Sequence, residues 1–168
     1  VNFVDAYRSF TAIPEPKMED ISAKKLLDRV LSLAAAENKL LNIKTEYFVR
    51  PEDLLLNIDA AQIEMTLINL MKNAREAIQN AERHNKEVKE WRITIRVGSD
   101  SRGYAFIEVE DNGPGIPADL LEEIFIPFFT TKPEGTGVGL SISRQIMQQH
   151  GGDLRVSSEP GRGTRFVL

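Results

Sequence analysis

The chain has 168 residues, 42% hydrophobic and 27% charged, which are the proportions of one globular domain and exclude a disordered tail or a fibrous repeat. It contains no cysteine and only two histidines, His84 and His150, so we exclude disulfides, cysteine nucleophiles and thiolate metal sites and expect no multi-histidine metal centre. Acidic residues outnumber basic ones, 25 to 21, and the resulting net charge of −4 argues against a nucleic-acid partner.

Residues 1–16 predict the end of a helix followed by a stiff linker. Phe3, Tyr7 and Phe10 recur at helical spacing and form an apolar seam that needs a partner outside the chain. Two prolines then stop the helix, because proline disfavours the helical conformation of the residue before it. We therefore expect the chain to be a piece of a longer protein, with its globular domain in residues 17–168.

The domain up to residue 109 predicts two helices and four strands. Ser22 is a candidate N-cap for a helix with an apolar stripe, and Asp59 is a candidate N-cap for a second helix that runs to about residue 80. Apolar runs, with a turn at Asp100–Gly103 before the last of them, predict strands at 43–49, 54–58, 92–97 and 104–109.

The rest of the domain predicts a glycine- and proline-rich region followed by one helix and two strands. The region holds a short helical stretch around 118–124, and the helix ends at Gly151-Gly152, because glycine is a common C-terminal stop. The helix and the strands are expected over residues 140–149, 153–158 and 163–168. Strands and helices segregated in this way predict an α+β fold with helices on one face of a sheet. No segment approaches the roughly 18 apolar residues of a membrane span, so we expect no direct membrane contact.

The predicted helix after Asp59 carries a polar face formed by Asn69, Asn73, Glu76 and Asn80, which follow one another at steps of four, three and four residues. Such a face is ordinarily in contact with solvent. The alternative is that Asn73 offers its amide oxygen to Mg²⁺, which prefers hard oxygen ligands and takes most of them from water and substrate phosphates. From these residues alone, both interpretations stay open.

Two glycine-rich segments are candidate ligand-binding loops. The segment from Asp111 to Ile116 leaves a strand end, where the carboxylate can accept a hydrogen bond from an exocyclic amine and the glycines let the backbone approach a flat ring. The segment from Gly135 to Ser141 enters a helix, whose first N–H groups attract phosphate, and Lys132 adds a cation three residues earlier. The first segment does not match a calcium loop, and the second matches neither a dinucleotide fingerprint nor a Walker loop. A plain turn and a plain helix entry are the alternatives.

Five sequence blocks occur in a fixed order along the chain. They are Asn69–Ala77, Asp111–Ile116, Phe125–Lys132, Gly135–Leu140 and Gly161–Phe166. Together they resemble the asparagine, phenylalanine and glycine boxes of the ATP-binding catalytic domain of two-component sensor histidine kinases. The resemblance covers about residues 18–168, and the sequence Pro-Phe-Phe-Thr-Thr-Lys is similar to the nitrogen-regulation branch. It implies a two-layer α/β sandwich with a mixed, mostly antiparallel sheet and about three helices on one face, preceded in residues 1–16 by the end of the dimerisation helix and a linker.

The resemblance also implies a site for ATP with Mg²⁺. It makes Asn73 the magnesium ligand, assigns Asp111 to the adenine amine, and places the catalytic residues Lys132 and Asn69 near the phosphates. In phosphoryl transfer such residues act by positioning and by neutralising charge. The residues that the resemblance assigns to nucleotide binding are Asn69, Asn73, Glu76, Asp111, Gly113, Gly115, Ile116, Thr131, Lys132, Gly135, Thr136, Gly137, Val138, Gly139, Leu140 and Thr164.

The asparagine at position 69 bears on the reaction. ATPases of the same superfamily usually carry a glutamate there, four residues before the magnesium ligand, and that glutamate acts as a general base. An amide cannot take up a proton in this way. The resemblance therefore implies a kinase that donates the γ-phosphate to a histidine. An ATPase whose nucleotide clamps a dimer, and a degenerate binding module, are the alternatives.

The phosphorylated histidine is expected outside this chain. The family's histidine lies in a His-Glu motif of a helical hairpin, which neither His84 nor His150 matches. We expect His84 in solvent and His150 at a helix end, where a cation would be favourable beside the last carbonyl groups. The implied partners are the parent protein's own phosphoacceptor helical domain, within a homodimer, and a response regulator. We expect this fragment to lie in the cytoplasm and not to phosphorylate itself, and we leave open whether its parent is anchored in the bacterial inner membrane.

Overall fold

The structure is a computed structural model that describes residues 13–84, 90–132 and 135–168. The expected N-terminal helix lies outside the described residues, and so does the side chain of His84. No helix within the described ranges is long and apolar enough to cross a membrane.

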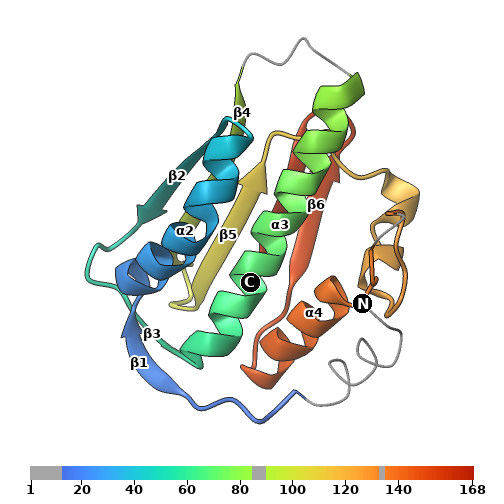
Figure 1. The fold of residues 1–168 in the computed structure, drawn as a ribbon. Helices are drawn as coiled ribbons and strands as arrows, with labels where there is room; N and C mark the ends of the chain where they lie inside the picture. Colours follow the sequence, from blue (N-terminus) through green and yellow to red (C-terminus); the bar gives the residue numbers. More distant parts are fainter. Residues whose placement is uncertain (1–12, 85–89, 133–134) are drawn as a thin grey trace.

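A five-stranded sheet forms one layer of the molecule (Figure 1). Its first strand, at one edge, runs parallel to its neighbour, and the other neighbouring pairs are antiparallel. In spatial order the strands are β2 (Ile43–Val49), β4 (Trp91–Ser99), β5 (Ala105–Asp111), β7 (Gly163–Val167) and β6 (Arg155–Glu159). The mixed, mostly antiparallel sheet predicted from the sequence is therefore confirmed.

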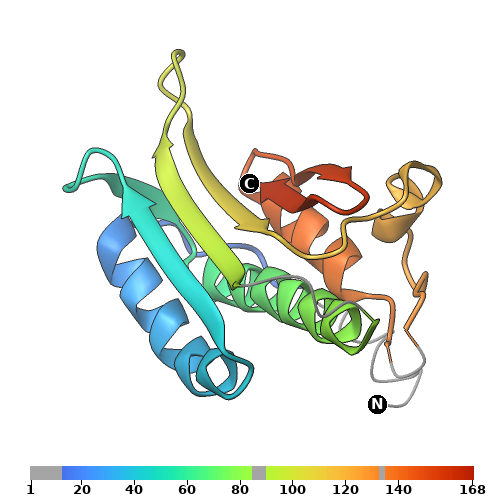
Figure 2. The same ribbon diagram turned by 90° about the horizontal axis from the view of Figure 1, so that it is seen from above.

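Three helices form the second layer and cover one face of this sheet (Figures 1 and 2). They are α2 (Ala23–Leu40), α3 (Ala60–His84) and α4 (Gly139–Gln149). Two short 3-10 helices, η1 (Ala118–Leu120) and η2 (Glu123–Phe125), replace the single helical stretch expected between β5 and α4. The predicted two-layer α/β sandwich with three helices on one face is confirmed.

The sequence pattern did not predict the short strand β1 (Glu19–Ser22), which pairs antiparallel with β3 (Leu55–Ile58) in a separate two-stranded sheet. Only Ile21 of β1 is apolar and buried. Four residues with one apolar side chain carry no periodic signal, and the strand exists because its partner is in place.

Both predicted N-caps are present. The Ser22 hydroxyl accepts a hydrogen bond from the Lys25 N–H (3.5 Å), and Asp59 Oδ1 accepts one from the Gln62 N–H (3.0 Å). Each cap satisfies an N–H group that the first turn of a helix leaves without an intrahelical partner. The side chains that α3 presents to the sheet are buried, among them Ile63, Leu67, Leu70, Met71 and Ile78. Burying such a side chain stabilises the fold by about 1.5–3 kcal/mol.

The first turn of α3 is also connected to residues 14–17, which precede β1. Asp59 Oδ2 accepts a hydrogen bond from the Lys17 N–H (2.8 Å), and the Gln62 side chain donates one to the Pro14 carbonyl (2.9 Å). The hydrogen bond from the Lys17 N–H is the main reason that the pKa of Asp59 is lowered. The chain that enters the domain is therefore held at the first turn of α3.

His150 closes α4, and its ring nitrogens connect the ends of two helices. Its Nε2 accepts a hydrogen bond from the Asp59 N–H (3.0 Å), which requires that nitrogen to carry no proton. The proton then lies on Nδ1, which donates to the Ile146 carbonyl (2.8 Å). One imidazole therefore joins the end of α4 to the start of α3 without adding a charge.

Candidate functional site

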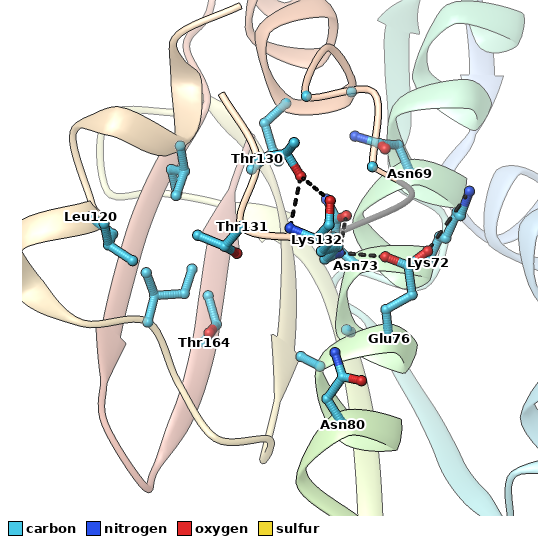
Figure 3. A pocket seen from close by; sticks show the side chains of 18 of the residues that line it. Asn69, Lys72, Asn73, Glu76, Asn80, Leu120, Thr130, Thr131, Lys132 and Thr164 are labelled. Atoms are coloured by element: carbon cyan, nitrogen blue, oxygen red, sulfur yellow. Dashed lines mark hydrogen bonds and ion pairs between the residues drawn. The ribbon is translucent and has the colours of Figure 1, made fainter. Parts of the chain in front are cut away.

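A cavity of about 930 Å³ opens between α3, the start of α4, the segment after β5 and the last hairpin (Figure 3). Its volume is in the range that small-molecule sites occupy. Fourteen of the sixteen residues expected to bind nucleotide line it: Asn69, Asn73, Glu76, Asp111, Gly115, Ile116, Thr131, Lys132, Gly135, Thr136, Gly137, Gly139, Leu140 and Thr164. The other two, Gly113 and Val138, lie outside its wall.

The polar face of α3 forms one wall and meets Lys132 across the cavity. The Lys132 ammonium donates a hydrogen bond to Asn73 Oδ1 (3.2 Å) and forms an ion pair with Glu76 (Figure 3). Lys72 approaches the same carboxylate from the preceding turn of the helix, at 3.8 Å. Asn73 and Glu76 thus present hard oxygen atoms around a position that already attracts a cation, which fits the donor chemistry of Mg²⁺.

Asn69 lies one turn earlier on α3 and connects this helix to α4. Its amide donates a hydrogen bond to the Ser143 hydroxyl (3.0 Å). A Cβ atom added to Gly139 would lie only 2.4 Å from Asn69 Oδ1, so any larger residue there would displace the Asn69 side chain from its present position. Ser143 was not among the residues predicted for the site, because no sequence pattern indicates a contact between residues so far apart in the chain.

The start of α4 is the candidate phosphate-binding element. Gly137 has a φ of +68°, and a Cβ atom there would lie 2.4 Å from the Phe128 carbonyl carbon. The Phe128 N–H in turn donates to the Gly137 carbonyl (2.8 Å). The helix begins at the cavity wall, where its first N–H groups favour an anion. Val138 is buried, so its side chain belongs to the core beneath this segment.

Asp111 ends β5 at the opposite wall, where it is only 7% exposed. Its Oδ1 accepts a hydrogen bond from the Gly113 N–H (2.8 Å), and a Cβ atom on Gly113 would lie 2.7 Å from that oxygen. Gly113 therefore supports the carboxyl group from outside the cavity. Burial raises the pKa of Asp111 to about 6, while the N–H groups of Gly113 and Thr164 act in the opposite direction.

The segment after Asp111 is fixed to the hairpin between β6 and β7. The Gly161 N–H donates to the Pro114 carbonyl (2.7 Å), and the Ile116 N–H donates to the Ser158 hydroxyl (2.8 Å). Gly115, with a φ of +74°, passes so close to the hairpin that a Cβ atom would lie 2.2 Å from the Glu159 carbonyl oxygen. Ser158 was not among the residues predicted for the site; in the structure it pairs with Thr164 across the hairpin.

The sequence of this chain matches that of a known protein family. The model of the histidine kinase-, DNA gyrase B- and HSP90-like ATPases matches residues 58–168. The chain belongs to this ATPase family. Its relatives include the sensor histidine kinase ZraS of Escherichia coli O157:H7, which is 33% identical over 90% of this chain. The match spans 31% of the length of ZraS, so this ATPase-family domain corresponds to one part of its relative.

Solved structures agree with the fold and with the histidine kinase branch of the family. The catalytic domain of histidine kinase ThkA matches 90% of this chain and 93% of its own, with a TM-score of 0.75 and 32% sequence identity. ThkA in complex with the response regulator TrrA matches 98% of this chain and 45% of its own, with a TM-score of 0.78 and 28% identity. This domain therefore has the fold of a histidine kinase catalytic domain. The nitrogen-regulation branch is not distinguished by these matches.

Proposed function

We propose that this domain binds ATP with Mg²⁺ in the cavity and donates the γ-phosphate to a histidine on an adjacent helical domain of its parent protein. One observation carries the proposal. The cavity combines a buried acceptor at the end of β5 with hard oxygen atoms, an ammonium group and a helix start on the opposite side. An aminated base and a polyphosphate have the complementary chemistry.

The base is expected at Asp111. An ionised carboxylate accepts hydrogen bonds and donates none, so it suits the exocyclic amine of adenine and opposes the carbonyl that guanine carries at the same position. Gly115 and Ile116 line the cavity beside it and are held by the last hairpin. We therefore expect ATP to be preferred over GTP.

The phosphates are expected between α3, Lys132 and the start of α4. Asn73, with its hard amide oxygen, would hold Mg²⁺, which when bound supplies positive charge that neutralises the phosphates during transfer. That oxygen now accepts a hydrogen bond from the Lys132 ammonium. Lys132 thus lies where its positive charge would be available to the phosphate oxygens of a nucleotide bound beside Asn73.

In the proposed reaction the bond between the γ-phosphorus and ADP breaks as an imidazole nitrogen bonds to phosphorus. This domain contributes position and charge and needs no proton acceptor. Asn69 is an amide whose nitrogen is engaged with Ser143, so it does not replace the glutamate base of hydrolytic relatives. A histidine nucleophile, which attacks through a lone pair, suits such a site.

The partners follow from the relatives. We propose that the parent protein supplies the phosphoacceptor helical domain in a homodimer and passes the phosphate to a response regulator, as the complex of ThkA with TrrA supports. The ZraS relative is bacterial, and we propose a cytoplasmic position for this domain.

Calorimetry with Mg²⁺ and ATP tests the proposal on the chain as it stands. Asp111→Asn is expected to weaken binding about 10- to 100-fold, because a hydrogen bond to a charged group is worth about 1.5–3 kcal/mol. Asn73→Ala should reduce the dependence of ATP affinity on Mg²⁺. Binding that neither substitution alters would refute the proposed site.

Phosphate release separates the kinase from the hydrolase. The isolated chain with Mg²⁺ and ATP should release inorganic phosphate no faster than its Asp111→Asn variant. Sustained release that depends on Asp111 would instead identify an ATPase.

A further inference from the structure

Ser158, on β6, has every hydrogen-bonding position of its hydroxyl group occupied. Its oxygen accepts a hydrogen bond from the Ile116 N–H (2.8 Å). It lies 2.8 Å from the Gly163 carbonyl oxygen and 3.0 Å from Thr164 Oγ1. A serine hydroxyl has one hydrogen to donate and two lone pairs to accept with, so these three contacts use all of them.

The donors and acceptors around the Ser158 hydroxyl determine which group donates in each of these three hydrogen bonds. The Gly163 carbonyl can only accept, so the single hydrogen of Ser158 must lie between these two oxygens; otherwise two acceptors would face each other at 2.8 Å. The contact between Ser158 and Thr164 then needs a hydrogen from Thr164. The Thr164 hydroxyl is therefore committed as a donor to Ser158.

Thr164 is 6% exposed, lines the cavity and is the β7 neighbour of Asp111 in the sheet (Figure 3). Because the hydroxyl hydrogen of Thr164 is directed at Ser158, the Thr164 oxygen can only accept hydrogen bonds from a ligand in the cavity. The ionised carboxylate of Asp111 beside it also only accepts. This wall thus presents two neighbouring acceptors and favours a ligand edge, or a wall-bound water, that donates.

We propose that Ser158 is a specificity-determining positioning residue, which holds the Thr164 hydroxyl as an acceptor toward the base and thereby favours a 6-amino purine over a 6-oxo purine. This inference rests on the proposed binding of ATP and assigns to Ser158 a part of the base discrimination. Without Ser158, the Thr164 hydroxyl can turn and donate to the carbonyl of a 6-oxo purine. Ser158 itself does not touch the base.

The test compares ATP with inosine triphosphate, which has a carbonyl in place of the amine. Dissociation constants for both are measured by calorimetry with wild type, Ser158→Ala and Ser158→Thr. Ser158→Ala should lower the preference for ATP about threefold to tenfold, the range that one neutral hydrogen bond is worth. Ser158→Thr, which keeps a hydroxyl group, should restore the preference. Ser157→Ala is the matched control, since Ser157 is the exposed neighbour on the same strand.

A merely structural role would weaken both nucleotides by the same factor, and that result, or an unchanged preference, would overturn the proposal. A double-mutant cycle with Thr164→Val adds a second criterion. Thr164→Val alone should lower the preference, and Ser158→Ala should change it no further in that background. An equal effect of Ser158→Ala with and without the Thr164 hydroxyl would also overturn it. Failure of the wild-type chain to bind ATP would refute the proposed function instead, so wild type is measured first.

Discussion

Asp111 combines deep burial with a carboxyl group that titrates close to neutral pH. Its surroundings raise its pKa to about 6, mainly by burial. The group is thus ionised at pH 7.5 and protonated well below pH 6. Only the ionised form offers both oxygens as acceptors to an amine.

ATP affinity is therefore expected to fall as the pH drops from 7.5 to 5. A donor such as the adenine amine favours the ionised carboxylate, so below about pH 6 binding must first remove a proton, which costs up to about tenfold in affinity per pH unit. Calorimetry across this range, on wild type and Asp111→Asn, measures the effect. The nucleotide titrates identically in both proteins, so the difference between the two curves isolates Asp111. Parallel curves would contradict this assignment.

The residues on α3 were predictable from the sequence in part. The spacing of Asn69, Asn73 and Glu76 placed them on one face of a helix, and the structure has them on the cavity wall. Their present partners were not predictable. The contacts of Asn73 with Lys132 and of Asn69 with Ser143 join segments that only the tertiary fold brings together.

The last hairpin shows how elements, more than single side chains, shape the cavity. Gly163, at the start of β7, has a φ of +107°, and a Cβ atom there would lie 2.0 Å from the Asp111 carbonyl oxygen. Glycine is therefore required for β7 to lie against the end of β5. Gly161, at the turn of the same hairpin, also has a positive φ of +81° but has open space around it.

This pair provides a matched test of the close approach. Gly163→Ala should lower the free energy of unfolding by more than about 2 kcal/mol, because backbone strain of about 1–3 kcal/mol adds to a clash with backbone that cannot move freely. Gly161→Ala should cost only about 1 kcal/mol, since it has the strain without the clash. Urea unfolding of both variants measures the difference. Equal losses would show that the approach of β7 to β5 does not constrain the fold.

Helices and strands whose apolar residues recur at regular spacing were predictable from the sequence, and elements without such spacing were not. The stripe on α3 and the candidate caps at Ser22 and Asp59 predicted the helices that form. The strand β1 carries no such stripe and is stabilised by pairing with β3. The glycine segments were predictable as turns, but the contact of Gly115 with Glu159 depends on how two distant turns meet.

The whole molecule offers no described histidine that is free to act as a nucleophile. Both nitrogens of His150 are engaged, Nδ1 with the Ile146 carbonyl and Nε2 with the Asp59 N–H. A nitrogen that carries a proton or accepts a hydrogen bond has no lone pair available for attack on phosphorus. His150 is therefore not available as the phosphate acceptor in this conformation.

We therefore expect the isolated chain not to label itself with the γ-phosphate of ATP. When the helical phosphoacceptor domain of the parent protein is added in trans, labelled phosphohistidine should form on that domain. Acid-labile phosphate is measured with radiolabelled ATP, and Asp111→Asn serves as the control that lowers transfer. Label on the isolated chain would contradict this expectation.

The attachment of residues 14–17 to the first turn of α3 has a mechanical consequence. Asp59 and Gln62 bond Lys17 and Pro14, and the same helix carries Asn73 about 21 Å beyond Asp59 at about 1.5 Å per residue. The first turn of α3 thus bonds the preceding segment of the chain, and the middle of the same helix forms a wall of the cavity. A tilt of about 5° at the anchored turn displaces Asn73 by about 2 Å at this length. That displacement is comparable to the length of a bond between magnesium and oxygen, so a movement of residues 14–17 that tilted α3 would change the position of Asn73 in the cavity.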